Sequence, residues 1–310
     1  MLKQVQHDAI MSEQLTHGQI LCGTATTPSL DAALADYRDT LGLSLVEQGT
    51  LPADLAASWS TPASAGSRYA ILQPTSGAPS FLRLVEQSVP AEFVPVRTYG
   101  WAAFEITVQD VFGWPARLAD SGFDIVGEPK EIPGLPYFVA MQMLGRGREM
   151  IYLNEVRSNT PTSDLPPAQS LVDRMFIVIL ACADRPAVLD WYRDQLRLDI
   201  GVDYTIPYTM ISNAFGLPDD HLSTITMMQK GRMPIVEVDG YPDAATARGG
   251  DPDRLPAGNA TVTLAVDSLD ALDLDWIAPP VVRHGALYDG RRVGTVRGLA
   301  AELLELIETH

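Results

Sequence analysis

An internal repeat constrains the fold of this chain more than any other feature. The segment LDAALADYRDTLGLSLVEQ at 30–48 is echoed by RPAVLDWYRDQLRLDIGVD at 185–203, and the Tyr-Arg-Asp triplet at 37–39 returns at 192–194. In both copies an apolar run precedes the segment, apolar residues recur at helical spacing, and a Leu-x-Leu exit leads into a second strand. Because repeated supersecondary units decide an architecture, copies of one strand–helix–strand unit are expected.

A fainter echo joins AAFEITVQDVFGWPARLADSGFDIV at 102–126 to ATVTLAVDSLDALDLDWIAPPVV at 260–282. Each segment predicts an alternating strand, a turn, a short amphipathic stretch and a second strand, and further apolar strands follow. The pattern therefore predicts four strand–helix–strands units, two in each half of the chain. Because strands outnumber helices and each helix is a single crossover, the expected fold class is α+β rather than a doubly wound sheet.

The length of 310 residues favours two domains. Between the two halves lies RSNTPTSDLPPAQS, which is rich in Ser, Thr and Pro and has no hydrophobic period, as is typical of a linker. We therefore expect an N-terminal extension, an N-terminal domain, a linker and a C-terminal domain at 1–17, 18–156, 157–171 and 172–310.

Charge and cysteine usage exclude several classes of partner. The net charge is −17, from 22 basic and 39 acidic residues, and this field repels nucleic acid and anionic lipid. The N-terminus lacks the apolar core of a signal peptide, and no run of about 18 apolar residues could span a bilayer. Cys22 and Cys182 form no disulfide framework. We expect a cytoplasmic protein that binds neither nucleic acid nor membranes.

The motif SLDAALADYRDTLGL after the first strand resembles the vicinal oxygen chelate superfamily, which includes glyoxalase I, extradiol dioxygenases and bleomycin resistance proteins. The resemblance covers 18–157 and 172–308. It implies two tandem domains, each with two βαβββ units that curl a mixed sheet into a cup-shaped half-barrel around the site. It is specific for the fold and poor for function, because the superfamily hosts many chemistries. The N-terminal domain is expected to be structural, completing the shape or a homodimer contact.

Metal-using members of this superfamily take ligands, often His and Glu, from the first and last strands of each unit. Carried onto this sequence, the four positions of the first half are Cys22, Arg83, Ala103 and Tyr152. Those of the second half are Ile177, Glu237, Thr261 and Glu305. The second half thus keeps two carboxylates and lacks both histidines.

We accordingly expect no metal and no other cofactor. His284, in VVRHGALYDG, is expected on or near a strand that could face the cup. If a divalent ion such as Mg, Mn, Zn or Fe were held, its ligands would be Glu237, Glu305 and His284.

Without a metal, Glu237 and Glu305 sharing the C-terminal cup suggest acid–base catalysis. Repulsion between close carboxylates raises one pKa, so that one acid is protonated and the other ionised near neutral pH. Such a pair can remove and return a proton beside a carbonyl, as a lyase, isomerase or epimerase requires. Alternatively, an Arg satisfies one of these acids, or the acid lies at the wet mouth of the cup.

The segment 203–233 is longer than a simple hairpin and carries aromatic, thioether and amide side chains, which favours a lid over a flat apolar substrate. An ordinary amphipathic helix is the alternative. The expected substrate-binding residues are Tyr204, Tyr208, Asn213, Thr261, His284 and Arg292.

Three functions therefore remain open. The first is a lyase, isomerase or epimerase that acts on a small organic molecule, with aromatic compounds among the candidates, through Glu237 and Glu305. The second is a protein of the bleomycin-resistance type that sequesters such a ligand unchanged. The third is a metal-dependent relative of glyoxalase or of the ring-cleaving dioxygenases.

Overall fold

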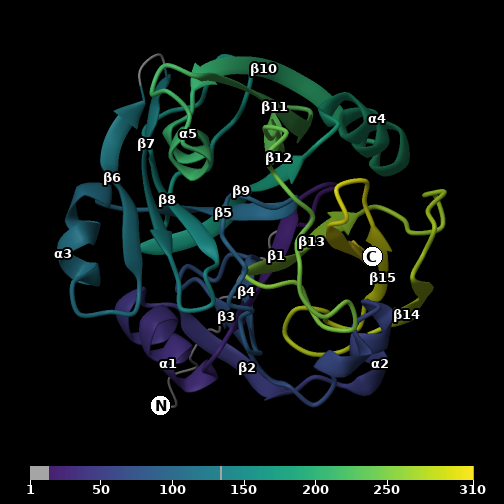
Figure 1. The fold of residues 1–310 in the computed structure, drawn as a ribbon. Helices are drawn as coiled ribbons and strands as arrows, with labels where there is room; N and C mark the ends of the chain where they lie inside the picture. The colour runs from purple at the N-terminus through teal and green to yellow at the C-terminus, as the bar shows by residue number, and fades with distance from the viewer. Residues whose placement is uncertain (1–13, 133–134, 310) are drawn as a thin grey trace, which may run out of the picture.

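The computed structural model describes residues 14–132 and 135–309 and contains two eight-stranded mixed sheets with a few short helices around them (Figure 1). This architecture confirms the expected α+β class. The first thirteen residues of the expected N-terminal extension lie outside the described range. Among the described helices, none combines the length and apolarity that crossing a membrane requires.

The first half of the chain holds two units. The first comprises β1 (Ile20–Thr27), α1 (Leu30–Leu34), η1 (Ala35–Thr40), β2 (Ser44–Thr50), α2 (Ala53–Ser58), η2 (Pro62–Ser64), β3 (Arg68–Gln73) and β4 (Phe81–Glu86). The second comprises β5 (Gly100–Val108), η3 (Val111–Gly113), α3 (Trp114–Leu118), β6 (Asp124–Ile132), β7 (Leu135–Leu144) and β8 (Met150–Val156).

The second half holds the other two units. The third unit comprises β9 (Val172–Cys182), α4 (Arg185–Leu196), β10 (Asp199–Pro207), α5 (Thr209–Phe215), β11 (Leu222–Lys230) and β12 (Met233–Gly240). The fourth comprises β13 (Asn259–Val266), β14 (Ala278–Val282), β15 (Arg292–Arg297) and β16 (Leu303–Glu308). Residues 157–171 form neither helix nor strand.

The Tyr of the repeated triplet has the same role in both copies. The Tyr37 hydroxyl donates to Glu149 Oε1 at 2.6 Å, and the Tyr192 hydroxyl donates to Glu302 Oε1 at 2.9 Å. Each Glu precedes the last strand of another unit, and all four side chains are buried. The repeat therefore marks where each long helical segment is tied to a neighbouring unit.

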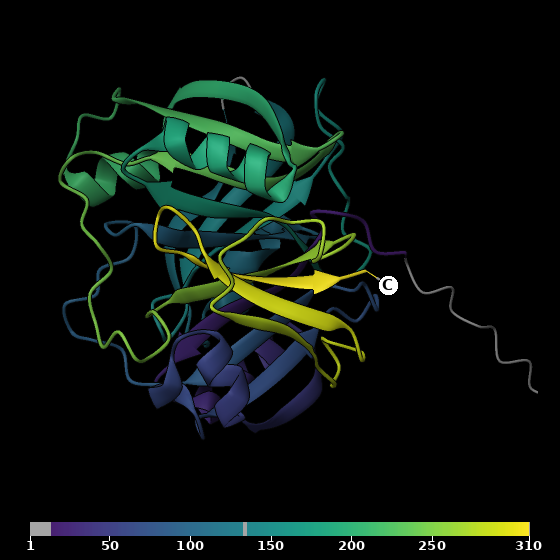
Figure 2. The ribbon, with the colours of Figure 1, turned by 90° about the vertical axis from the view of Figure 1, so that its right-hand side faces the viewer.

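The sheets join units from opposite halves of the chain. The first sheet has the order β14-β15-β16-β13-β1-β4-β3-β2, and the second has the order β10-β11-β12-β9-β5-β8-β7-β6. Units one and four thus share a sheet through the antiparallel pair β1–β13, and units two and three share the other through β5–β9. Figure 2 shows the C-terminal unit, in yellow, next to the first unit, in purple and blue, which it joins through the β1–β13 pair.

This pairing differs from the expected one, in which the two units of each half share a cup. The first strand of every unit is almost wholly buried and needs a partner on both sides. Its own unit supplies one partner, the parallel last strand. Because all four units carry the same alternating pattern, the pattern does not specify which unit supplies the second partner.

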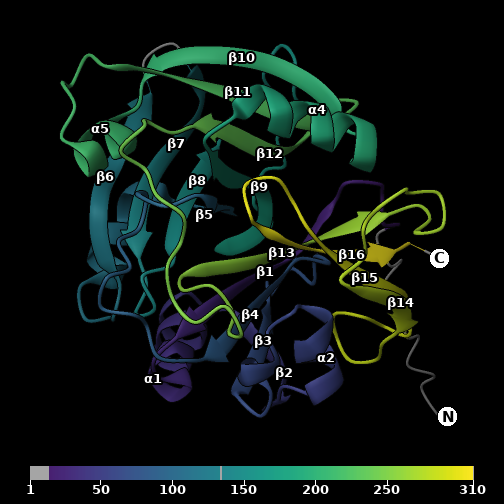
Figure 3. The ribbon, with the colours of Figure 1, turned by 45° about the vertical axis from the view of Figure 1, so that its right-hand side comes forward.

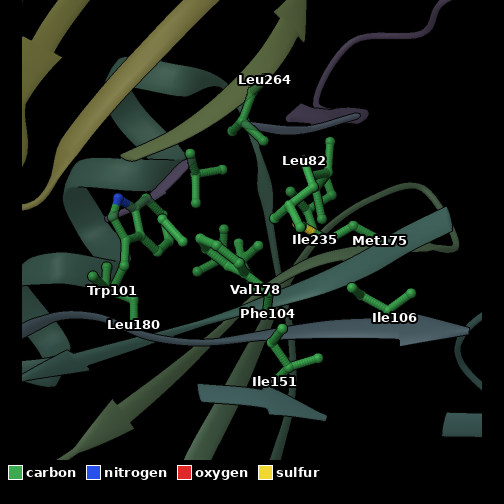
Figure 4. Packing of buried hydrophobic residues seen from close by; sticks show 14 of the residues in the cluster. Leu82, Trp101, Phe104, Ile106, Ile151, Met175, Val178, Leu180, Ile235 and Leu264 are labelled. Atoms are coloured by element: carbon green, nitrogen blue, oxygen red, sulfur yellow. The ribbon is translucent and has the colours of Figure 1, made fainter. Parts of the chain in front are cut away.

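The largest core lies between the two sheets. Phe104 of β5 and Val178 of β9 pack in one cluster with Leu82 of β4 and Leu264 of β13 (Figure 4). Burying each such side chain contributes roughly 1.5–3 kcal/mol. The opposite face of each sheet holds separate clusters, so each sheet has one face on the shared core and one face in its own cup. The segment 241–258 runs from β12 of one sheet to β13 of the other (Figure 3).

Candidate functional site

The cup of units one and four, here called the first cup, is built around Glu305. This side chain is completely buried and accepts hydrogen bonds from Thr263 Oγ1 at 2.9 Å, Trp59 Nε1 at 3.0 Å, the Tyr288 hydroxyl at 3.0 Å and Arg83 Nη2 at 3.3 Å. Four donors, one of them cationic, satisfy the carboxylate. The alternative in which an Arg satisfies one of the predicted acids therefore describes Glu305.

Aromatic rings fix the cation of this pair. The Arg83 guanidinium carbon lies 4.9 Å from the centre of the Trp59 ring and 5.5 Å from that of Tyr288, both within cation–π range. Burial raises the pKa of the adjacent Cys22 thiol to about 11, against the opposing effect of Arg83. A thiol with so high a pKa is a poor nucleophile at neutral pH.

The rim of the first cup is closed by contacts between its two edges. The backbone amide of Ala286, beyond β14, donates to Glu47 of β2 at 2.6 Å, and Arg283 forms an ion pair of 2.8 Å with Asp54 of α2. Apolar residues from α2 and from the loop after β14, including Leu55 and Leu287, occupy the interior. Side chains therefore fill this cup.

The cup of units two and three, here called the second cup, contains a cluster of buried acids. Glu105 lies on β5, and Glu237 and Asp239 lie on β12 with exposed fractions of 7% or less for all three. None of the ion pairs formed by the described residues involves these acids. Buried charge without a partner is costly, so protonation of the cluster is favoured.

Neutral groups supply the donors in this cluster. Asn154 Nδ2 of β8 donates to Glu105 Oε2 at 2.8 Å. The hydroxyl of Tyr208 donates to Glu237 Oε1 at 3.2 Å and is hydrogen-bonded to the Tyr152 hydroxyl at 3.2 Å. The acids are thus oriented by amide and phenol groups and have no counter-cation among the residues that the structure describes.

Burial raises the pKa of Glu237 to about 7, although the hydrogen bonds from Tyr208 and Asp239 oppose the shift. The pKa of Glu105 is raised well above its usual range by burial and then by the charge of Glu237. The pKa of Asp239 is raised by burial and then by the charges of Glu237 and Glu105. Acids that repel one another in this way share protons near neutral pH.

Two of the acids, Glu105 and Glu237, lie on a cavity of about 160 Å³. Its polar lining includes Glu105, Tyr152, Asn154 and Glu237, and its apolar lining includes Phe138, Ile177, Ile206, Ile225 and Met227. The edge strands β6 and β10 both contribute to it, and Lys130 Nζ of β6 donates to Thr209 Oγ1 of α5 at 3.1 Å. An apolar cavity with a few convergent polar groups is the usual form of a small-molecule site.

The linker also belongs to the cavity wall. Thr160, Thr162, Ser163 and Leu165 line it, together with Tyr204, Tyr208 and Met210 from the segment expected to form a lid. That segment is a strand–helix–strand rather than a single insertion, because β10 and β11 extend into it on either side of α5. The cavity is therefore covered from both its linker side and its α5 side.

The predicted site residues divide between the two cups. Glu237, Tyr204 and Tyr208 line the cavity of the second cup. Asn213 lies on α5 with its side chain exposed, and it does not line the cavity. The predicted helix is thus present, but its amide points away from the site.

The remaining predicted residues lie in the first sheet. Glu305 and Thr261 are buried there, and His284 is exposed in the loop after β14 rather than facing a cup. Arg292 forms ion pairs with Asp270 at 2.8 Å and Glu308 at 3.4 Å. The expectation that Glu237 and Glu305 share one pocket is wrong, because β12 and β16 belong to different sheets.

Sequence reasoning missed the acids that do accompany Glu237. Glu105 stands two residues after the first-strand position Ala103, and Asp239 stands two residues after Glu237 itself. Side chains two apart on a strand share a face. The residue two positions after each motif position faces the same way, and examining these positions would have identified both acids. The same step from Tyr152 leads to Asn154.

The metal ligands that the resemblance implies do not come together. Glu237, Glu305 and His284 lie in separate places, as described above. Within residues 14–132 and 135–309, no group of three or more His, Cys, Asp or Glu side chains is arranged to hold a metal ion. The residues present thus do not fit the metal that the superfamily uses.

Comparison with known proteins confirms the fold. No family model and no curated protein matches the sequence. Among solved structures, glyoxalase I from Zea mays has a TM-score of 0.59 at 14% identity, covering 94% of this chain and 92% of that one. A putative dioxygenase from Bacillus subtilis has a TM-score of 0.59 at 13% identity, covering 96% and 86%. The chain therefore has the fold of these two proteins, and these identities carry no conclusion about activity.

Proposed function

We propose that the chain binds a small organic molecule in the second cup and catalyses proton transfer on it, as a lyase, isomerase or epimerase does. The observation that supports this most is Glu237, a buried carboxyl group on the cavity wall whose pKa is raised to about 7. General acid–base catalysis is most effective when the pKa of the group lies near the working pH, and contributes about 10²- to 10⁴-fold.

The surrounding groups give Glu237 the freedom to exchange a proton. Tyr208 donates to Oε1 and orients the carboxyl group, while burial disfavours its ionisation. In its ionised form Glu237 would take a proton from a carbon beside a carbonyl, and in its acid form it would return one. Glu305 is proposed to be structural, since four donors hold it.

The test is proton exchange in D₂O. A panel of small carbonyl compounds with an acidic C–H would be incubated with the protein, and deuterium incorporation would be measured by mass spectrometry. The wild type is expected to exchange at least one compound, and Glu237→Gln to lose about 10²-fold or more of that rate. Glu92→Gln, at an exposed position, is the matched control. Unchanged exchange by folded Glu237→Gln would disprove the proposal.

A ligand-sequestering protein is the second candidate. It is favoured by the way the linker and α5 enclose the small cavity, which suits retention of a ligand. This candidate predicts stoichiometric binding with the ligand recovered chemically unchanged and without deuterium. Catalytic exchange of the bound molecule would exclude it.

A further inference from the structure

The inner wall of the second cup contains an acceptor that has no donor. Asn154 is completely buried on the cavity wall, and its Oδ1 has no hydrogen-bond partner in the described structure. Its Nδ2 is already committed to Glu105, which fixes the amide so that this oxygen is left over. A buried acceptor without a donor is unfavourable, so a ligand that supplies a donor here gains affinity.

The donors near these acceptors are already used. Tyr208 donates to Glu237, and Asn154 Nδ2 donates to Glu105. The cationic group that lines the cavity, Lys130 Nζ, belongs to the exposed bridge with Thr209. The inner wall therefore offers a ligand two carboxyl groups and an amide oxygen as acceptors.

This arrangement distinguishes classes of ligand by charge. A carboxylate or phosphate group would meet acceptors and buried acids, with repulsion and unsatisfied hydrogen bonds as the result. An ammonium group carries three donors and a positive charge, so it can donate to Glu105 and Asn154 Oδ1, and its charge favours the ionised form of Glu105. The apolar lining, which includes Phe138, Ile177 and Met227, suits a hydrocarbon or aromatic body attached to that group.

We propose that the ligand of the second cup is an organic amine, bound through its protonated nitrogen by Glu105 and Asn154 with its apolar body against β9 and β11. This inference deepens the proposed function and rests on the same cavity. It assigns the Glu105–Asn154 pair to binding, and it leaves the Glu237–Tyr208 pair for proton transfer.

The test compares three probes that share a body and differ in charge. Binding of 2-phenylethylammonium, 2-phenylethanol and 3-phenylpropionate to the full chain would be measured by isothermal titration calorimetry at pH 7. The ammonium compound is expected to bind at least tenfold more tightly than the alcohol, with the carboxylate weakest. Equal or tighter binding of the carboxylate would overturn the proposal. A rise in the unfolding temperature with Mg²⁺, Mn²⁺ or Zn²⁺ alone, together with no binding of the amine, would also overturn the proposal.

Variants locate the amine and separate this proposal from the catalytic one. Glu105→Gln and Asn154→Leu are expected to weaken binding of 2-phenylethylammonium at least tenfold, while the control Glu92→Gln, at an exposed position, retains it. Thermal unfolding of each variant shows that it is folded before binding is measured. Unchanged affinity in folded Glu105→Gln and Asn154→Leu would overturn the proposal. Amine binding without exchange in D₂O would contradict only the proposed catalysis, and exchange without amine binding would contradict only the ligand class.

Discussion

Two glutamates on the last strands of related units, Glu305 and Glu237, have opposite surroundings. Glu305 lies beside Arg83 and accepts from three neutral donors, whereas Glu237 has two acids as neighbours and a phenol as donor. The contrast arises from the other unit of each cup, which supplies an Arg in one case and Glu105 in the other. The partner unit, rather than the strand that carries the acid, therefore decides the chemistry of each position.

The buried pair of the first cup should behave as one structural unit. Arg83→Met leaves the Glu305 charge unpaired in the interior and is expected to lower the free energy of unfolding by about 3–5 kcal/mol. The double variant Arg83→Met/Glu305→Leu removes both charges and should recover most of that loss. Urea unfolding of the single and double variants measures the coupling. If the losses in the free energy of unfolding of the two substitutions simply add in the double variant, Arg83 and Glu305 do not act as one unit.

Glu237 should make stability fall as pH rises through the weakly acidic range. Its folded pKa of about 7 exceeds its usual value of 4.5, so folding favours the protonated form. Stability from this group is fully present below about pH 4.5 and is lost as pH approaches 7. Glu237→Gln should therefore be more stable than the wild type at pH 8, by of order 1–3 kcal/mol, and similar to it at pH 4. The same difference in stability between Glu237→Gln and the wild type at pH 4 and pH 8 would refute the raised pKa of Glu237.

At the scale of elements, the turn between β7 and β8 joins the two sheets. A Cβ at Gly147 would lie 1.7 Å from the carbonyl oxygen of Thr26 on β1, a backbone atom that cannot move aside cheaply. Gly147→Ala should therefore destabilise the fold by about 1–3 kcal/mol or more. Gly249→Ala is the matched control, because a Cβ there meets nothing within 4 Å. Equal unfolding midpoints for the two variants would contradict this close approach.

Much of the element pattern could be predicted from the sequence. Alternation and helical spacing indicate the first strand of each unit and the helical segments that follow it in the first three units. The fourth unit has turns and bends at 267–277 in place of the expected helix, and α2 was not predicted. The positions of Glu237, Tyr204 and Tyr208 in the site follow from the motif and the lid segment. Glu105 and Asn154 could not be joined to them, because that requires knowing that β5 pairs with β9.

At the scale of the whole molecule, each half of the chain completes the sheet of the other half. One chain therefore supplies both eight-stranded sheets, with the core between them. The sequence predicts two halves joined by a linker, and this division is not the one that the sheets follow. Pairing across halves depends on long-range strand contacts that local patterns do not encode.

Cutting the linker should leave the protein assembled. A specific protease site inserted between Pro166 and Pro167 would allow cleavage into two fragments. Because β1 pairs with β13 and β5 pairs with β9, the fragments are expected to elute together at the size of the intact chain in size-exclusion chromatography. Separation into two folded halves under native conditions would show that each half forms its own cup.

The central claim is that the second cup, and not the first, is the functional site. Deuterium exchange into a substrate, per folded molecule, should be compared directly in Glu237→Gln and Glu305→Gln. The account predicts that Glu237→Gln loses about 10²-fold or more of the exchange rate, while Glu305→Gln unfolds more easily and exchanges at the wild-type rate. Loss of exchange in Glu305→Gln with full exchange in Glu237→Gln would contradict it.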